Sequence, residues 1–366
     1  MSTPKLFQPF KLGDIELKHR IVLSPLTRYR ANSEHVPTDL QAKYYAQRAS
    51  MPGTLLITEA TFINQRAGGY ANVPALETAN QLEGWKKVVD GVHAKGSFIF
   101  SQLWALGRTA RPDYLAKAGY DLVSASDIPL KGRSKPRPLT TTEIKQYVGW
   151  YIQAAINAVQ KVGFDGVEIH SANGYLLHQF LEDHSNLRTD EYGGSIENRV
   201  RFILEVVEGV TNAIGQKKTA IRISPFNPFQ DMGMEDPYPT YSYLVQQLAE
   251  RFPDLAYIHA VDPRESSDTP DGLNGKSLDT FRNIWSPRPF ISAGSYTPEL
   301  ALEVANNKGD LIAFGRNFLA NPDLPYRIKN KLPLNQPDYS TFYTAETPVG
   351  YIDYPFADTE KKTEAT

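Results

Sequence analysis

Eight short apolar segments recur along the 366-residue chain, and a longer segment with helical spacing follows each one. They cover residues 21–26, 55–60, 98–104, 166–171, 219–225, 255–261, 290–295 and 311–317. Several are apolar throughout, which is typical of parallel strands buried on both faces. Parallel neighbours in a sheet need a long crossover connection, usually a helix, so the alternation restricts the chain to few folds.

The clearest helical segment covers residues 141–162. Its apolar residues fall at three- and four-residue steps and form one stripe. Thr140 and Glu143 make a capping box at its start, and Gly163 follows its end, where a C-terminal glycine is common. Residues 198–210 and 241–252 show the same spacing.

Eight alternations without a break in composition predict an α/β fold, a single (β/α)₈ TIM barrel over residues 1–357. The rival is a doubly wound sheet, which usually carries a glycine-rich turn directly after its first strand. Here the first run continues into Ser24-Pro25-Leu26-Thr27-Arg28, without glycine. This favours the barrel.

Three segments lie outside the repeat. Residues 7–17 hold two short runs around Gly13-Asp14 and predict an N-terminal β-hairpin at the barrel bottom. Residues 105–138 form a long loop insertion after the third strand, expected to act as a lid or pocket wall because it lies on the active-site side of a barrel. Residues 358–366 are charged and predict a disordered tail.

Composition excludes several classes of function. The chain has no cysteine, which rules out disulfides, thiolate metal sites, iron–sulfur clusters and a cysteine nucleophile. A net charge of −2 offers no electrostatic grip on nucleic acid or an anionic membrane. The seven histidines show no metal-binding spacing, so no metal is expected. No signal peptide or membrane-spanning run is visible, and the cytoplasm is the expected location.

Polar and glycine residues stand at the carboxyl ends of six of the predicted strands, where barrel active sites form. They are Thr27, Gln102, Trp104, His170, Asn173, Tyr175, Arg222, Gly294 and Arg316. Each residue alone is a weak signal. Because the barrel brings these strand ends to one mouth, the set as a whole predicts a binding and catalytic site.

The end of the fourth strand carries the strongest candidates. His170 and Asn173 can both donate hydrogen bonds to one oxygen, an arrangement that stabilises developing negative charge. Tyr175 lies close by in sequence and can act as a general acid. A lone histidine would more often be a core residue, but its position beside Asn173 and Tyr175 favours the catalytic interpretation.

The last two strands end in Gly294-Ser295 and Gly315-Arg316. Loops in this position often bind phosphate in barrels, since glycine lets backbone N–H groups approach and arginine can clamp the oxygens. A phosphorylated ligand is therefore expected. Arg222 lies inside an apolar run, and spacing alone leaves open whether it makes a structural ion pair or meets an electron-rich ring.

The chain also contains long motifs of a known family. They include His170-Ser171-Ala172-Asn173-Gly174-Tyr175 and Asn186-Leu187-Arg188-Thr189-Asp190-Glu191-Tyr192-Gly193-Gly194. Agreement continues at Pro25-Leu26-Thr27-Arg28, Gly68-Gly69-Tyr70, Gln102-Leu103-Trp104, Gly315-Arg316 and Gly350-Tyr351-Ile352-Asp353-Tyr354-Pro355. Over essentially the whole chain except the tail, the sequence resembles the Old Yellow Enzyme family of flavin reductases, in its yeast-like and fungal branch.

The resemblance implies a barrel that holds FMN non-covalently, with NADPH, or NADH, as the hydride donor. It implies that the cofactor contacts Pro25, Leu26, Thr27, Ala60, Gln102, Arg222, Gly294, Ser295, Gly315 and Arg316. Within that set Thr27 would tune the flavin potential, Gln102 would contact the pyrimidine ring, and Arg222 would stabilise the reduced anion.

The same resemblance implies an ene-reductase that acts on small-molecule activated alkenes. His170 and Asn173 would hold the substrate's carbonyl or nitro oxygen, hydride would go to the β-carbon, and Tyr175 would protonate the α-carbon. Pocket-lining positions match Trp104, Phe229, Phe342 and Tyr343. The 225–239 loop is less familiar, and Tyr29 stands where relatives often have methionine.

Three alternatives remain. A flavin-assisted double-bond isomerase of a fungal alkaloid pathway would share the scaffold, but replacement of the tyrosine favours isomerisation, and Tyr175 is present. An aldolase-type barrel is poorly supported, since no lysine ends a predicted strand. A purely binding role would have no use for a proton donor. A monomer and a homodimer fit equally well.

Overall fold

The computed structural model describes residues 3–263 and 275–357, and the predicted tail at 358–366 lies outside them. Eight parallel strands, each inside one of the predicted runs, form a closed barrel. They are β3 (Ile21–Leu23), β4 (Leu55–Ile57), β6 (Phe98–Trp104), β9 (Gly166–Ser171), β10 (Thr219–Ile223), β11 (Ile258–Val261), β12 (Phe290–Ala293) and β13 (Leu311–Phe314). The last strand pairs with the first, Ala313 opposite Val22, which closes the barrel. The prediction of a (β/α)₈ barrel is confirmed.

Most strands end earlier than the apolar runs that predicted them. The first ends at Leu23, so that Pro25, Leu26 and Thr27 follow it as a loop at the barrel mouth. A short strand, β5 (Thr61–Phe62), extends the sheet beside the end of β6 and pairs Phe62 with Trp104.

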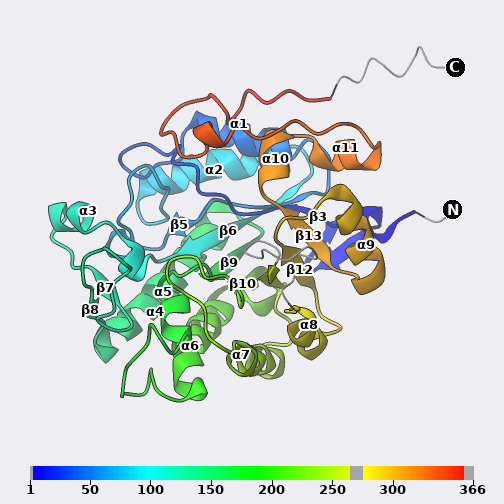
Figure 1. The fold of residues 1–366 in the computed structure, drawn as a ribbon. Coiled ribbons are helices and arrows are strands. Elements are labelled where there is room, and N and C mark those ends of the chain that lie inside the picture. Colours follow the sequence, from blue (N-terminus) through cyan, green and yellow to red (C-terminus); the bar gives the residue numbers. More distant parts are fainter. Residues whose placement is uncertain (1–2, 264–274, 358–366) are drawn as a thin grey trace, which may run out of the picture.

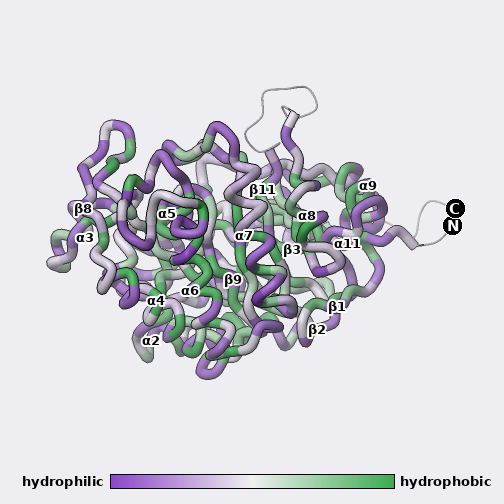
Figure 2. Tube along the Cα trace, turned by 90° about the horizontal axis from the view of Figure 1, so that it is seen from below, coloured by the Kyte–Doolittle hydropathy of each residue, from purple (hydrophilic) through white to green (hydrophobic). Residues whose placement is uncertain are grey.

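Helices surround the strands (Figure 1). The longer ones are α1 (Asp39–Arg48), α2 (Ala79–His93), α4 (Thr141–Ile156), α6 (Ile196–Ile214), α7 (Tyr238–Arg251) and α9 (Pro298–Lys308). Shorter ones are α3 (Pro112–Lys117), α5 (Leu176–Leu181), α8 (Asp279–Trp285), α10 (Arg316–Ala320) and α11 (Leu324–Lys329). Their apolar faces turn to the sheet, and Figure 2 shows hydrophobic segments such as β9 at the centre with hydrophilic segments around them.

The helix predicted over residues 141–162 begins as expected, with Thr140 and Glu143 forming a complete capping box. It does not continue as one α-helix. The α-helix ends at Ile156, and a π-helical turn, Asn157–Val162, follows. Within that turn the buried Asn157 side chain donates to the carbonyl oxygen of Leu76 at 2.8 Å, which ties the helix end to the 62–76 loop.

The predicted hairpin consists of β1 (Phe10–Leu12) and β2 (Ile15–Leu17), which pair antiparallel. Gly13 in its turn has φ +54°, a conformation that favours glycine. Leu12 and Leu17 are fully buried in a cluster with Leu55 and Leu311, the first residues of β4 and β13. The hairpin therefore covers the amino-terminal end of the barrel, opposite the mouth.

The 105–138 insertion carries more structure than the loop that the sequence predicts. It contains α3 and two short strands, β7 (Val123–Ser124) and β8 (Arg137–Pro138), which lie together at one edge of the molecule (Figure 1). The short lengths of these elements left no periodicity long enough to detect in the sequence.

Candidate active site at the barrel mouth

Three aromatic side chains make a wall at the mouth. Trp104 ends β6, His170 lies near the end of β9, and Tyr175 caps the start of α5. The Tyr175 ring meets the Trp104 ring edge-on at 4.6 Å between centroids and the His170 ring at 5.0 Å. Trp104 and His170 are nearly parallel at 6.3 Å. The structure thus brings together residues that are 71 positions apart in sequence.

Asn173 completes this corner and is held by its own backbone. Its φ of +54° is a left-handed conformation, which asparagine tolerates better than most residues. Its N–H donates to Ser224 Oγ at 2.8 Å, and its carbonyl oxygen accepts from Gln230 Nε2 at 2.9 Å. A Cβ at the next residue, Gly174, would lie 2.7 Å from Gln230 Cβ, so only glycine lets the loop approach this closely.

Burial sets the protonation of the two titratable groups at this corner. Burial, and secondarily the neighbouring Tyr70, raise the pKa of the Tyr175 phenol far above its ordinary value. Burial, and secondarily the positive charge of Arg222, lower the pKa of His170 well below its ordinary value. Near neutral pH the phenol therefore keeps its proton, and the imidazole is uncharged.

Charged and polar side chains fill the barrel interior below the wall. Arg222 on β10 stands opposite His170 in register and is 9% exposed. One layer deeper, Gln102 Nε2 donates to Glu168 Oε1 at 2.7 Å, and Glu168 Oε2 lies 2.8 Å from His259 Nδ1. The Glu168–His259 contact joins β9 to β11 past the intervening β10, so it crosses the inside of the barrel. The sequence analysis missed this pair.

The loops after β12 and β13 lie side by side, because the two strands are neighbours. Gly294 has φ +118°, and a Cβ there would lie 3.0 Å from the carbonyl oxygen of Asp262. Ser295 Oγ accepts from Arg316 Nη2 at 3.0 Å. A Cβ on Gly315 would lie 3.3 Å from Leu26 Cδ2, which brings the loop after β3 to the same place.

Of the predicted pocket residues, only Trp104 is deeply buried. Phe229 and Tyr343 are exposed at 57% and 68%, and Phe342 is half-buried. Tyr343 reaches the wall through Tyr29, at 5.8 Å between ring centroids. Phe342 lies beside Tyr343 at 6.4 Å between ring centroids, and the carbonyl oxygen of Phe229 lies 3.1 Å from the position of a Cβ on Gly174. These contacts place the three residues at the rim of the mouth.

A chain of rings connects that rim to the wall. Tyr29 meets Tyr70 at 6.3 Å between centroids, and Tyr70 meets Trp104 at 5.8 Å. Tyr29 adopts φ +56°, and burial raises its pKa to about 12. The sequence marked Tyr29 as a departure from relatives but assigned it no role.

Comparison with known proteins identifies the family of the chain. A model of the NADH:flavin oxidoreductase / NADH oxidase family matches residues 5–335. The chain belongs to this family. The solved Old Yellow Enzyme from Pichia sp. AKU4542 superposes with a TM-score of 0.90 at 38% identity, over 99% of this chain and 96% of that one. The resemblance to the Old Yellow Enzyme family is thereby confirmed, together with the FMN-dependent oxidoreductase class.

Fungal relatives cover nearly the whole chain. A chanoclavine-I aldehyde reductase of Penicillium roqueforti is 48% identical over 99% of both chains. An NADP-dependent oxidoreductase of Aspergillus flavus is 46% identical over 97% of both. A probable inactive reductase of Epichloe festucae var. lolii is 45% identical over 100% of this chain and 99% of its own.

The residues at the mouth fit the FMN that an Old Yellow Enzyme relative requires. On the side predicted to meet the substrate, two buried polar atoms, His170 Nδ1 and Trp104 Nε1, have no hydrogen-bond partner among the described residues, as expected where a bound ligand completes the site. Gly294 and Gly315 keep the backbone open beside Arg316, which suits a phosphate. No group of metal-ligating side chains occurs in the part of the chain that the structure describes.

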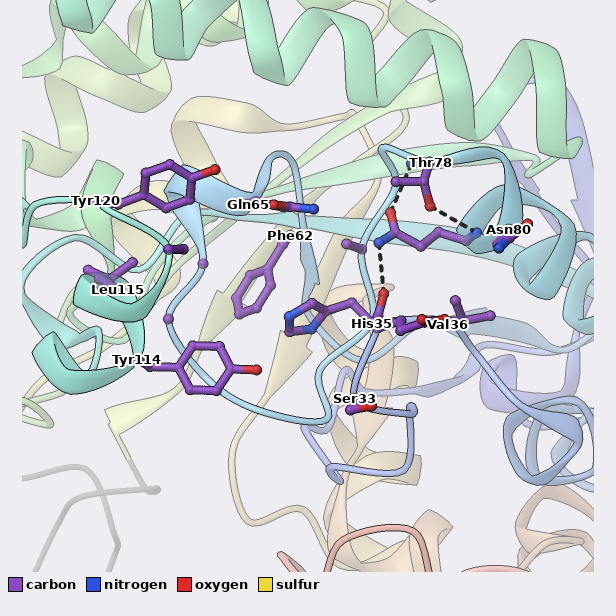
Figure 3. A pocket seen from close by; sticks show the side chains of 16 residues that line it. Ser33, His35, Val36, Phe62, Gln65, Thr78, Asn80, Tyr114, Leu115 and Tyr120 are labelled. Carbon is purple, nitrogen blue, oxygen red and sulfur yellow. Dashed lines mark hydrogen bonds between the residues drawn. The ribbon is translucent and has the colours of Figure 1, made fainter.

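A second hollow, of about 460 Å³, is lined by Phe62 and by side chains from the 33–36 and 114–120 segments (Figure 3). Phe62 stacks on Trp104 at 5.4 Å between centroids, while His35 and Tyr114 face the hollow. None of the predicted site residues lines it. The hollow is therefore separate from the barrel mouth, with the stacked rings of Phe62 and Trp104 between them.

None of the helices described here is both long and apolar enough to cross a membrane.

Proposed function

We propose that this Old Yellow Enzyme relative is an ene-reductase, which uses non-covalently bound FMN and NADPH, or NADH, to reduce the activated C=C bond of an unsaturated aldehyde, ketone or nitro compound. The observation that carries the proposal is the corner of the mouth where the partly buried Tyr175 ring packs against Trp104 and His170. Desolvation there raises the pKa of its phenol. Asn173 completes the corner with a side-chain amide.

The cofactor would be held by the loops after four strands, β3, β4, β12 and β13, and by Gln102 and Arg222 from within β6 and β10. The backbone and side chains at its edges would be those of Pro25, Leu26, Thr27, Ala60, Gln102, Arg222, Gly294, Ser295, Gly315 and Arg316. Gln102 donates one amino hydrogen to Glu168, which sets the orientation of its amide and leaves its carbonyl oxygen to accept from a ligand N–H.

When bound, FMN supplies the hydride for the β-carbon after taking it from the nicotinamide. The chain's own groups do the rest. His170 and Asn173 hold the substrate oxygen and stabilise the negative charge that develops on it. Tyr175 gives its proton to the α-carbon, which requires a phenol that is still protonated at neutral pH, and burial provides that. Trp104, Phe229, Phe342 and Tyr343 would border the substrate.

The fungal relatives support an aldehyde as one substrate class, since two of them are named aldehyde reductases. Others of similar identity are named probable inactive enzymes, so overall likeness does not decide activity. The presence of Tyr175 favours net reduction over double-bond isomerisation.

Two measurements test the proposal. The purified protein should be yellow and should bleach when NADPH is added without oxygen. Tyr175→Phe should leave this bleaching nearly intact and slow turnover of 2-cyclohexenone by about 10²-fold or more, the usual contribution of a general acid. A colourless protein that takes up no FMN would overturn the flavin assignment. Full turnover by Tyr175→Phe would remove Tyr175 from its role, and product formation without NADPH consumption would indicate an isomerase.

A further inference from the structure

The loop after β10 contains an asparagine, Asn227, that touches the candidate oxygen-holding residue. Asn227 Nδ2 donates to Asn173 Oδ1 at 3.1 Å. On its other side, Asn227 Oδ1 accepts from the backbone N–H of Phe229 at 3.0 Å, an Asx turn. The two asparagines are 54 positions apart, and no sequence motif connects them.

This pair of contacts fixes which way both amides face. A backbone N–H can only donate, so the atom of Asn227 that meets Phe229 must be its carbonyl oxygen. The Asn227 amino group then has to face Asn173. Since that amino group can only donate, Asn173 must present its own carbonyl oxygen to Asn227 and has its amino group left for another partner.

The remaining freedom of Asn173 is small. Its backbone is fixed at both the N–H, by Ser224, and the carbonyl, by Gln230. The same loop is anchored to the insertion, where Arg108 Nη2 donates to the carbonyl oxygens of Gln230 and Asp231 at 3.2 Å. The Asn173 side-chain amide can still rotate by half a turn about its last bond. That rotation would replace the amino group that faces the substrate with the carbonyl oxygen.

We propose that Asn227 is a positioning residue that holds the Asn173 amide with its amino group directed to the substrate. The inference rests on the proposed function, because it assumes that Asn173 meets a substrate oxygen. With His170 uncharged, the pair then offers neutral donors, which suit a carbonyl or nitro oxygen that only accepts.

Asn227→Asp tests this directly, because it retains one role and removes the other. A carboxylate at this position still accepts from the Phe229 N–H, so the Asx turn survives. It cannot donate, so Asn173 has to turn its amino group to residue 227 and its carbonyl oxygen to the substrate. We expect kcat/KM for 2-cyclohexenone to fall about 10- to 100-fold, mainly through KM, the effect of replacing one donor with an acceptor.

Asn227→Ala is the matched control. It removes the turn and the contact together, but leaves Asn173 free to direct either atom to the substrate. Positioning therefore predicts that Asn227→Asp is the more damaging variant. A purely structural role predicts the reverse order, since only the alanine variant loses the turn. Melting temperatures of both variants show which one disturbs the loop.

Two further measurements separate the remaining explanations. Binding of cyclohexanone, which has the oxygen but no C=C bond, should weaken in Asn227→Asp by the same factor. In an Asn173→Ala background the Asn227→Asp change should have no further effect on kcat/KM, whereas an effect of the new charge itself would persist. A persisting effect, or equal activity of all the Asn227 variants, would overturn the inference. A wild-type protein that does not reduce 2-cyclohexenone but binds cyclohexanone through Asn227 would instead overturn the proposed function.

Discussion

His170 is buried and Tyr175 is partly buried, and loss of solvent moves their pKa values in opposite directions. The phenol's pKa rises and the imidazole's pKa falls, so each group is electrically neutral over a wide pH range. Proton donation and hydrogen bonding to the substrate oxygen, which a single histidine often combines, are therefore assigned to two different residues in the proposed site. In the proposed reaction Tyr175 would supply the proton, and His170 would offer a hydrogen bond without changing its charge.

This neutrality predicts a flat pH profile. When NADPH-reduced holoenzyme is mixed with 2-cyclohexenone in a stopped-flow instrument, the rate of the alkene step should change less than about twofold between pH 6 and pH 9.5. A histidine or tyrosine with its usual pKa would titrate near 6.5 or 10. A break near pH 6.5 that disappears in His170→Asn would show that the imidazole is charged at the lower end of this range. A decline above pH 8 that disappears in Tyr175→Phe would show that the phenol ionises too easily.

At the scale of single residues, the sequence indicated the candidate site residues but not the neighbouring residues that hold them in place. Strand-end positions placed Tyr175, His170 and Asn173 at one mouth because the barrel topology does so. The contact of Asn227 with Asn173 depends on the path of an irregular loop, which has no periodicity to read. The Glu168–His259 pair did leave a signal, since a carboxylate and an imidazole inside buried strands need a partner.

At the scale of elements, the segment from Tyr339 to Tyr351 shows how a nearly irregular stretch can be fixed at the mouth. The fully buried Arg30 donates from Nη2 to the carbonyl oxygens of Thr341 and Val349, at 3.0 and 3.1 Å, and from Nε to that of Thr347 at 3.0 Å. The segment carries the rim residues Phe342 and Tyr343. The hydrogen bonds of the buried Arg30 therefore help to fix the position of these two side chains at the mouth.

Arg30→Lys should loosen this segment. Lysine keeps the charge but lacks the planar guanidinium group that reaches these three carbonyl groups at once. We therefore expect the free energy of unfolding to fall by about 1–3 kcal/mol and the KM for 2-cyclohexenone to rise several-fold. Chymotrypsin should cleave the variant faster near Phe342. Arg251→Lys, an exposed change on α7, should alter neither quantity. Unchanged cleavage and KM in Arg30→Lys would mean that Arg28, which bonds Phe342 and Gly350, fixes the segment alone.

Elements with a strong period were predictable, and short elements were not. All eight barrel strands lie within apolar runs, because strands that are buried on both faces consist mainly of apolar residues. The capping box at Thr140 located the start of α4 correctly. The π-helical turn after Ile156 and the small elements of the insertion depend on tertiary contacts, so local sequence gave no sign of them.

At the scale of the whole molecule, the barrel separates stability from chemistry. The mouth is built from loops that carry polar and strained residues, while the opposite end is closed by the β1–β2 hairpin with apolar side chains. This division is general in barrels of this type, where residues at the amino-terminal face serve stability. It predicts that the two ends can be perturbed independently.

Leu12→Ala tests that independence. Leu12 is fully buried in the cluster that joins the hairpin to β4 and β13, so its truncation should cost about 2–5 kcal/mol. The urea midpoint of the FMN-loaded protein should fall accordingly, whereas kcat and KM for 2-cyclohexenone should stay within about twofold of wild type under native conditions. Glu16→Ala, an exposed change on the same hairpin, should shift neither the midpoint nor the kinetics. If Leu12→Ala lowered kcat at unchanged flavin content, the loss of packing at the closed end would have to change the geometry of the mouth through the strands. The two ends of the barrel would then not be independent.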